Sequence, residues 1–402
     1  MIQETEHFFS RPVRIEENRL VLLSDSEAAH RLGRLREAMA SAVIDTGVVS
    51  GNVSKLYLTG RVFVGWIVVT PTSVTYYVRR PVGLEGNNVV YVRKPEEINF
   101  SEAGGKIGFE LDTASYSAIE RLSAVAGIET PANLSVALRQ ARSVKTEEEI
   151  ALIERSGKLQ ERVYRRIAGL YRAGMSDLEF QIEIERQSRL SGCLGQFRIS
   201  GDSMELFMGN VLAGDNADTP TPYDFAMGGA GTDPSLPVGA DGTVISGGMT
   251  VMVDVNGNYT GYMTDMTRVY RLGRISELAE DAHRCSIEIL RKLEKAGMPG
   301  VKAAELYETA ENIVKEAGLQ AYFMGHRQKA GFIGHGVGIE INEAPVIAPR
   351  SRDVLESGNV IAIEPKFVVP GTGAVGVENT YVVTESGLRC LTNLPEEIIE
   401  LI

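Results

Sequence analysis

The segment VDVNGNYTGYMTDMT, residues 253–267, places two carboxylates among residues that favour β-strands. The Asn, Gly and Thr residues in its middle are typical of a turn, so the segment predicts a β-hairpin. With the turn centred on Tyr259-Thr260, Asp254 lies opposite Asp265, with Cβ atoms about 5 Å apart. Like charges directly opposite each other destabilise a sheet, and a divalent cation held by oxygen ligands is the simplest partner that would neutralise them. The alternative is that both acids flank a turn in water.

Three further polar residues follow in apolar or glycine-rich surroundings. His335 lies between the glycines of GHGVG, where the backbone can pack closely and orient the imidazole. Glu364 ends the apolar run IAIEP, and Glu378 lies in GVENTYVV. A single histidine or strand glutamate is more often structural than a ligand. Two aspartates, one histidine and two glutamates in this order favour a ligand set instead.

The first third of the chain alternates helix and strand patterns, as in an α/β domain without a dinucleotide fingerprint. A helix is predicted near residues 26–40, with Ser24 or Asp25 as its N-cap. Strands are predicted at VSKLYLTG (53–60), VGWIVVT (64–70) and VTYYVRR (74–80). The last two form a hairpin through the turn that contains Pro71.

A capping box, Thr146-x-x-Glu149, marks the start of a second domain. It opens a helical pattern that stops at Gly174. Because 402 residues exceed what one core usually organises, two domains are expected. The boundary predicts domains at residues 1–144 and 145–402.

Charge and composition limit the classes of binding partner and indicate a cellular location. The chain has 41 basic and 53 acidic residues and a net charge of −12, which disfavours nucleic acid and anionic membranes as partners. It has no run of eighteen apolar residues, and its N-terminus lacks the basic-then-apolar pattern of a signal peptide. The 3 cysteines are widely spaced, which is typical of reduced thiols in a cytoplasmic protein.

Taken together, these residues resemble the methionine aminopeptidase, prolidase and creatinase group, which has the pita-bread fold. In that group D-x-G-x-x-x-x-G-Y-x-x-D-x-T-R supplies two aspartates, G-H-G-x-G a histidine, and E-P and a later E two glutamates. This sequence matches at Asp254, Gly261-Tyr262, Asp265, Thr267-Arg268, His335, Glu364-Pro365 and Glu378. YLTGR at 57–61 is similar to the creatinase/prolidase N-terminal domain. The resemblance covers nearly the whole chain and implies an α+β architecture, with a C-terminal pita-bread fold after an N-terminal α/β domain.

The resemblance also implies a dinuclear metal site. Asp254 would chelate one ion and His335 the other. Asp265 and Glu378 would bridge the pair, with Glu364 completing the ligands and moving the proton. Oxygen-rich ligation with one imidazole suits Mn²⁺, with Fe²⁺, Co²⁺ or Zn²⁺ as alternatives. The implied protein is a metal-dependent hydrolase of the Xaa-Pro dipeptidase or aminopeptidase type, a homodimer that activates water for amide hydrolysis of small peptides.

The sequence departs from the family pattern around the ligands rather than among them. Peptidases of the group carry a histidine in the loop before the first aspartate, but this chain has none between His30 and His283. Asn342, in INEAP, stands where a second histidine is usual. Gly376 stands where proline-specific members have an arginine. These departures leave the metal ligands intact and alter the substrate surroundings.

Four residues are predicted to act where the family residues are missing. The Asn342 amide would donate to the tetrahedral intermediate. Tyr223 would replace the loop donor and Asp224 would bind a substrate amine, with ordinary turn residues as the alternative for both. Lys366, directly after Glu364-Pro365, would meet a substrate carboxylate.

Three classes of function fit these observations. The first is the peptidase described above. The second is a pita-bread enzyme with a small non-peptide metabolite as substrate, which the altered substrate surroundings favour. The third is a non-catalytic binding protein, against which the complete ligand set argues. Creatinase activity is disfavoured because that enzyme uses a loop histidine that this chain lacks.

Overall fold

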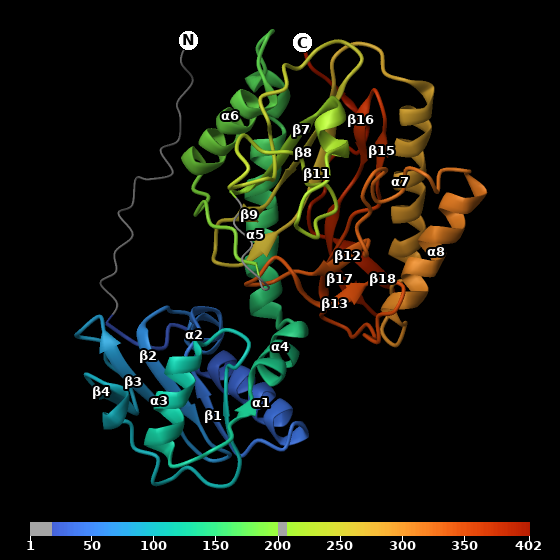
Figure 1. Cartoon of the computed structure of the whole chain (residues 1–402). Helices are drawn as coiled ribbons and strands as arrows, with labels where there is room; N and C mark the ends of the chain where they lie inside the picture. Colours follow the sequence, from blue (N-terminus) through green and yellow to red (C-terminus); the bar gives the residue numbers. More distant parts are fainter. Residues whose placement is uncertain (1–17, 200–206) are drawn as a thin grey trace. The chain divides into compact units, whose positions relative to one another are not determined.

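The computed structural model describes residues 18–199 and 207–402, and the chain divides into two compact units (Figure 1). The first unit contains the described residues up to Arg142. The second extends from Ser143 to Ile402.

The first unit is built on a six-stranded mixed sheet in the order β4-β3-β2-β1-β5-β6. Strands β1, β2 and β3 pair antiparallel, whereas β4, β5 and β6 join in parallel. The strands are β1 (Thr46–Val49), β2 (Val64–Val69), β3 (Val74–Arg80), β4 (Val89–Tyr91), β5 (Ile107–Phe109) and β6 (Ala132–Asn133). The helices are α1 (Asp25–Ser41), α2 (Asn52–Thr59), α3 (Tyr116–Ala126), α4 (Ser135–Ser143) and the short 3₁₀ helix η1 (Pro95–Glu97). This is the α/β domain that the sequence predicts, with Ser24 as the N-cap of α1 and β2 and β3 as a hairpin.

The prediction of a strand at residues 53–60 is wrong, because this segment forms helix α2. The helix ends at Gly60, whose φ of 71° lies in the left-handed region. Its N-terminus is bound by a residue far along the chain. Glu110 accepts hydrogen bonds from the Gly51 N–H at 2.6 Å and the Ser54 hydroxyl at 2.6 Å. A short apolar run fits either element, and a cap from a distant residue leaves no local signal.

In the described part of the second unit, the strands form two larger sheets and two short ribbons. The sheets have the strand orders β19-β11-β8-β7 and β13-β12-β14-β17-β18, and the ribbons are β9-β10 and β15-β16. The first sheet contains β7 (Gly209–Ala213), β8 (Thr250–Val255), β11 (Thr267–Arg271) and β19 (Ile399–Glu400). The second contains β12 (Gly334–Gly336), β13 (Glu343–Ile347), β14 (Val360–Ile363), β17 (Asn379–Thr384) and β18 (Gly387–Cys390). The ribbons are formed by β9 (Gly257–Asn258), β10 (Met263–Thr264), β15 (Lys366–Val369) and β16 (Gly373–Gly376).

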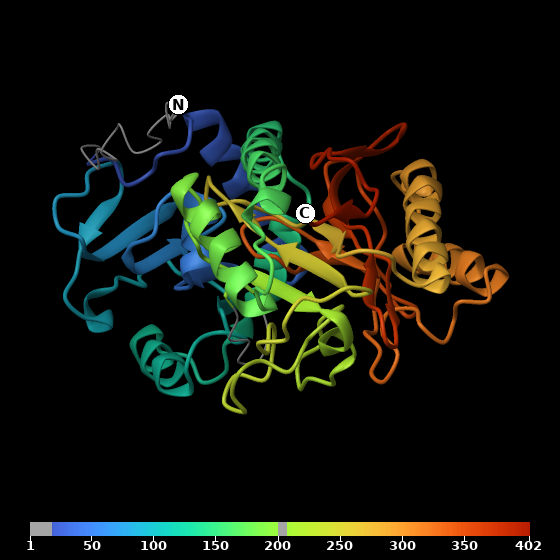
Figure 2. The ribbon, with the colours of Figure 1, turned by 90° about the horizontal axis from the view of Figure 1, so that it is seen from above.

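Two pairs of helices lie on opposite sides of these strands (Figure 2). The helices are α5 (Glu147–Tyr164), α6 (Asp177–Leu190), α7 (Glu277–Ala296) and α8 (Ala303–Glu316), with the short 3₁₀ helices η2 (Ile167–Leu170) and η3 (Gly214–Asp218). The capping box of Thr146 and Glu149 at the start of α5 is confirmed. On one side, Phe180 of α6 is buried with Val211 and Val251 of the first sheet. On the other side, Ile289 of α7 is buried with Ile361 of the second sheet.

The predicted register of the 250–270 hairpin is wrong by two residues. Asp254 pairs with Thr267 rather than with Asp265. The turn is centred one residue later than predicted, with Gly261 at a φ of 92°. Asp265 lies between β10 and β11, where its N–H donates to the Thr380 hydroxyl and its carbonyl accepts from it, both at 2.8 Å. A contact with a distant strand therefore takes Asp265 out of the ladder.

Candidate active site

The five predicted metal ligands converge in the second unit, where its two sheets meet. A bridge between Thr267 and Glu378 joins the sheets at this point. Asp254 lies on β8, Asp265 between β10 and β11, His335 on β12, Glu364 directly after β14, and Glu378 between β16 and β17. They form two groups of three, in which the ligand atoms lie within 4.8 Å of one another. The groups are Asp265, His335 and Glu378, and Asp254, Glu364 and Glu378.

His335 is oriented by the close packing of β12 between two neighbouring strands. A Cβ atom on Gly334 would lie 2.4 Å from the Ala362 carbonyl oxygen, so only glycine fits there. The Nδ1 atom of His335 lies 3.2 Å from the Gly336 carbonyl oxygen. Its Nε2 atom faces the acids, 3.4 Å from Oε1 of Glu364 and 3.9 Å from Oδ2 of Asp265. A proton on Nδ1 would leave Nε2 available as a metal ligand.

Arg268, the last residue of the aspartate motif, positions Glu378 through hydrogen bonds to the backbone. Its buried guanidinium donates to the carbonyl oxygens of Thr267 at 2.8 Å and Glu378 at 2.9 Å. It also donates to Oδ1 of Asn379 at 2.8 Å. The Thr267 hydroxyl donates to Oε2 of Glu378 at 2.7 Å. The sequence matched Arg268 to the motif but did not reveal this role.

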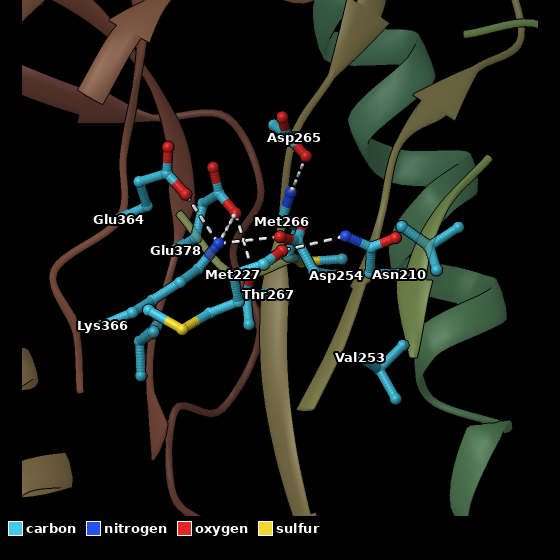
Figure 3. Close-up of polar contacts among 12 residues, drawn as sticks. Asn210, Met227, Val253, Asp254, Asp265, Met266, Thr267, Glu364, Lys366 and Glu378 are labelled. Carbon is cyan, nitrogen blue, oxygen red and sulfur yellow. Dashed lines mark hydrogen bonds and ion pairs between the residues drawn. The ribbon is translucent and has the colours of Figure 1, made fainter. Parts of the chain in front are cut away.

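The amine of Lys366 lies among the acids (Figure 3). Its Nζ atom is 2.6 Å from Oε2 of Glu364, 2.8 Å from Oδ2 of Asp254 and 3.2 Å from Oε2 of Glu378. The side chain is fully buried. Where the sequence suggested contact with a substrate carboxylate, the ammonium instead contacts three carboxylates of its own chain.

The donor set fits a divalent metal ion. Carboxylate oxygens with one imidazole suit such ions, and the Asp265, His335 and Glu378 group supplies both kinds of donor. Oε1 of Glu378 is buried and has no hydrogen-bond partner among the residues that the structure describes. A buried acceptor without a partner is unfavourable, and a bound ion would satisfy it.

The electrostatics of the site also favour a cation. Burial raises the pKa of Glu378 to about 8, with Glu364 adding to the rise and Lys366 opposing it. Burial likewise raises the pKa of Asp265, and Glu378 adds to it. Burial also acts to raise the pKa of Glu364. The positive charge of Lys366 and the contact with His335 outweigh burial and lower this pKa to about 2. The protein thus holds some acids protonated at pH values where they would normally be ionised, as expected where like charges crowd together.

A cavity of about 320 Å³ opens beside the ligands. Its lining includes Asp254, Asp265, His335 and Glu364, the apolar residues Phe197, Phe225, Phe332, Ile341 and Val346, and the polar residues Asn210, Asp224 and Asn342. The structure therefore brings two of the predicted substrate-contacting residues, Asp224 and Asn342, to the cavity. Tyr223 is not part of this lining, and its ring packs against Phe225 at a centroid distance of 5.8 Å.

Asn210 is a cavity residue that sequence reasoning missed. It lies on β7 directly opposite Asp254, and its Nδ2 donates to the Met227 carbonyl at 3.0 Å. Its position in the apolar strand GNVLA matches no motif. A polar side chain inside a buried strand was the only local signal that could have revealed it.

Comparisons with known proteins agree with this geometry. The family pattern of Metallopeptidase family M24 matches residues 151–385, more than half of the chain. The chain belongs to metallopeptidase family M24. The Creatinase/Prolidase N-terminal domain matches residues 31–144.

Individual relatives extend over nearly the whole M24 chain. The Xaa-Pro dipeptidase of Pyrococcus horikoshii is 27% identical over 378 residues, covering 92% of this chain and 98% of the relative. An uncharacterised peptidase of Bacillus subtilis is 26% identical over 384 residues, covering 92% of this chain and all of the relative. The structure of an Xaa-Pro dipeptidase from Bacillus anthracis superimposes with a TM-score of 0.77 at 26% identity, covering 93% of this chain and 100% of the other.

These matches confirm the resemblance and the α+β fold, a pita-bread domain after a creatinase/prolidase-type N-terminal domain. The M24 chain is a metal-dependent hydrolase, and its carboxylates and histidine form groups that could hold a divalent metal ion. Among the described residues, no helix has the length and apolar character needed to cross a membrane.

Proposed function

We propose that this M24 chain hydrolyses amide bonds in small peptides of the Xaa-Pro dipeptidase or aminopeptidase type. The observation that carries the proposal is the convergence of all five ligand residues beside a cavity of about 320 Å³. This volume is near the lower end of the range for small-molecule sites, which suits a dipeptide better than a long chain. The printed names of the similar proteins, Xaa-Pro dipeptidases among them, support the same substrate class.

Individual polar residues of the cavity have separate roles in the proposed reaction. A bound divalent ion would lower the pKa of water and polarise the substrate carbonyl. Glu364 lines the cavity as an ionised carboxylate and accepts the proton of the attacking water. The Asn342 amide donates to the oxygen on which negative charge develops. The exposed carboxylate of Asp224 binds the free amine of the peptide.

The proposed metal is Mn²⁺, because hard oxygen donors outnumber the single imidazole. Fe²⁺, Co²⁺ and Zn²⁺ are the alternatives. One ion fits the group of Asp265, His335 and Glu378. The second ion predicted from the sequence would have to enter the other group, whose oxygens Lys366 already contacts.

We also infer a homodimer and a cytoplasmic location. The dimer rests on the resemblance to the creatinase/prolidase group, and light scattering on the purified chain tests it. The location rests on cysteine chemistry, because Cys193, Cys285 and Cys390 are all unpaired. Tyr223 as a replacement donor stays a prediction.

The test is hydrolysis of a panel of Xaa-Pro and Xaa-Ala dipeptides by Mn²⁺-loaded protein, with bound metal measured in the same sample. We expect turnover that a chelator removes and Mn²⁺ restores. The Asp265→Asn variant serves as the control that lacks a ligand. Full metal occupancy with no turnover of any peptide would contradict the proposal and favour a small non-peptide metabolite instead.

A further inference from the structure

Lys366 contacts the same three residues that form the second ligand group. Its Nζ atom lies 2.6 Å from Glu364, 2.8 Å from Asp254 and 3.2 Å from Glu378. These three acids are one of the two groups that could hold a metal ion. We propose that the Lys366 ammonium permanently replaces one of the two divalent ions, so that the chain binds a single ion at Asp265, His335 and Glu378. This inference rests on the metal-binding part of the proposed function and not on the peptide substrate.

The two ligand groups differ in what the chain itself supplies. In the group of Asp254, Glu364 and Glu378, the lysine contacts an oxygen of every member. In the other group, Oε1 of Glu378 has no hydrogen-bond partner among the described residues. A cation is therefore already present at the group of Asp254, Glu364 and Glu378, whereas the group of Asp265, His335 and Glu378 has an acceptor that one ion would satisfy.

Like-charge repulsion opposes a second ion beside Lys366. An ion bound to the same three oxygens would lie close to the ammonium, in a site where the side chains of Lys366, Glu364 and Glu378 are buried. Charges of the same sign repel more strongly there than in water. Four carboxylates with one ammonium and one divalent ion have a net charge of −1, whereas a second divalent ion would change this to +1 and place two cations on the same three carboxylates.

The backbone around Lys366 is built to keep it in place. Lys366 on β15 pairs directly with Gly376 on β16. A Cβ atom at Gly376 would lie 2.7 Å from the Pro365 carbonyl oxygen, 2.9 Å from Lys366 Cα and 3.3 Å from Lys366 Cγ. Gly376 also has a φ of 138°, which L-residues rarely adopt. Only glycine leaves room for the lysine here.

Gly376, a departure from the family pattern, and Lys366 thus belong to one structural unit. Gly376 stands where proline-specific members of the family have an arginine, and Lys366 follows Glu364-Pro365 directly. An arginine at position 376 would collide with the strand that carries the lysine. A side chain at position 376 and the present position of the lysine are therefore sterically incompatible.

The test is the number of Mn²⁺ ions bound per chain, measured by elemental analysis after unbound metal has been removed. We expect one ion per chain in the wild type and two in Lys366→Met. Electron paramagnetic resonance gives a second readout, since one ion shows the hyperfine pattern of isolated Mn²⁺ and two neighbouring ions show exchange coupling. Two ions in the wild type, or no gain of an ion in a folded Lys366→Met protein, would overturn the proposal.

Two aspartate variants keep the proposal falsifiable if Lys366→Met does not fold. Asp254→Asn should still bind one ion, because Asp254 contacts the lysine rather than the ion. Asp265→Asn should bind none. Loss of the ion from Asp254→Asn would contradict the assignment.

A matched control is available in Lys145, whose side chain is 1% exposed and lies 2.9 Å from Glu343. Lys145→Met also removes a buried ammonium from an ion pair. In the described structure, the Lys145 ammonium contacts none of the five candidate ligands. It should leave the ion count at one. Because metal counting needs no substrate, failure of the peptide panel and failure of this inference are distinguishable.

Discussion

Two buried glutamates, one in each unit, differ in how far the chain satisfies their carboxylate oxygens with hydrogen bonds. Glu110 of the first unit is 5% exposed and accepts hydrogen bonds with both carboxylate oxygens, from the Gly51 N–H and from the Ser54 hydroxyl. Glu378 of the second unit is 1% exposed. Its Oε2 accepts from Thr267 and Lys366, but its Oε1 has no partner in the described part of the chain.

The difference separates a structural carboxylate from a functional one. A buried polar group is tolerated when its hydrogen bonds are made, and the chain completes them for Glu110. For Glu378 the chain leaves one oxygen incomplete and places further acids around it. A ligand from outside that completed these bonds would stabilise the arrangement, so a buried oxygen without a hydrogen-bond partner among crowded acids is evidence of a binding site.

The largest expected effect is loss of the metal from Asp265→Asn. This change removes one member of the group of Asp265, His335 and Glu378, in which Lys366 contacts Glu378 but neither of the other two ligands among the described residues. We expect metal binding and hydrolysis to disappear together. The metal-free variant should unfold at the same temperature as the metal-free wild type or higher, because one of several crowded carboxylates has been neutralised. Elemental analysis and thermal unfolding in chelator measure the two effects, and unchanged metal content would show that Asp265 is not a ligand.

The second prediction concerns pH. The pKa of Glu378 is about 8 in the metal-free fold, above its ordinary value of 4.5, because of burial. The resulting stability is fully present below about pH 4.5 and is lost as the pH rises towards 8. The raised pKa values of Asp265 and His335 act in the same direction. A metal ion needs the acids deprotonated, so its stabilising effect should grow over the same window.

The measurement is the difference in unfolding free energy between metal-loaded and metal-free protein from pH 5.5 to 8. At a free metal concentration of one hundred times Kd, this difference is about 2.7 kcal/mol. Taking the difference cancels groups remote from the metal, such as His283, whose pKa burial lowers. Asp265→Asn should show no metal-dependent difference at any pH. A difference that shrinks towards pH 8 would contradict the raised pKa values.

The five candidate metal ligands could be picked out from the sequence because each lies in a short local motif. The capping box of Thr146 and Glu149 likewise operates over three residues, and the structure has it as the sequence predicts. The motif GHGVG marks His335 because glycines are needed where strands pack closely. Short-range chemistry of this kind leaves a signature that one sequence shows without any structure.

The failures all involve partners far apart in the chain. The cap of α2 comes from Glu110, and the register of the 250–270 hairpin depends on Thr380. Lys366 lies only two residues after Glu364, but it also reaches Asp254, 112 residues away, and that distant contact left no local signal. These contacts depend on how strands assemble, and no spacing in the sequence encodes them.

A smaller effect is expected from Glu110→Gln, which tests the structural half of the comparison. A glutamine keeps the shape but cannot accept with both terminal atoms, so the Gly51 N–H or the Ser54 hydroxyl loses its partner. We expect a loss of about 1–3 kcal/mol in stability. Metal content should be unchanged, and denaturant unfolding with elemental analysis measures both. A change in metal content would mean that Glu110 is not purely structural.

The smallest effect is expected from Asp224→Asn, the exposed carboxylate of the cavity. Unlike Glu110 and Glu378, Asp224 keeps water around it, so a charge pair with a substrate amine is worth only about 0.2–1 kcal/mol. The KM for a dipeptide with a free amine should therefore rise about 1.4- to fivefold, with kcat and metal content unchanged. Steady-state kinetics at low and high salt measure this, and the rise should shrink at high salt because exposed charges are screened. A dipeptide with an acetylated amine is the control, and an equal rise in its KM would rule out an amine contact at Asp224.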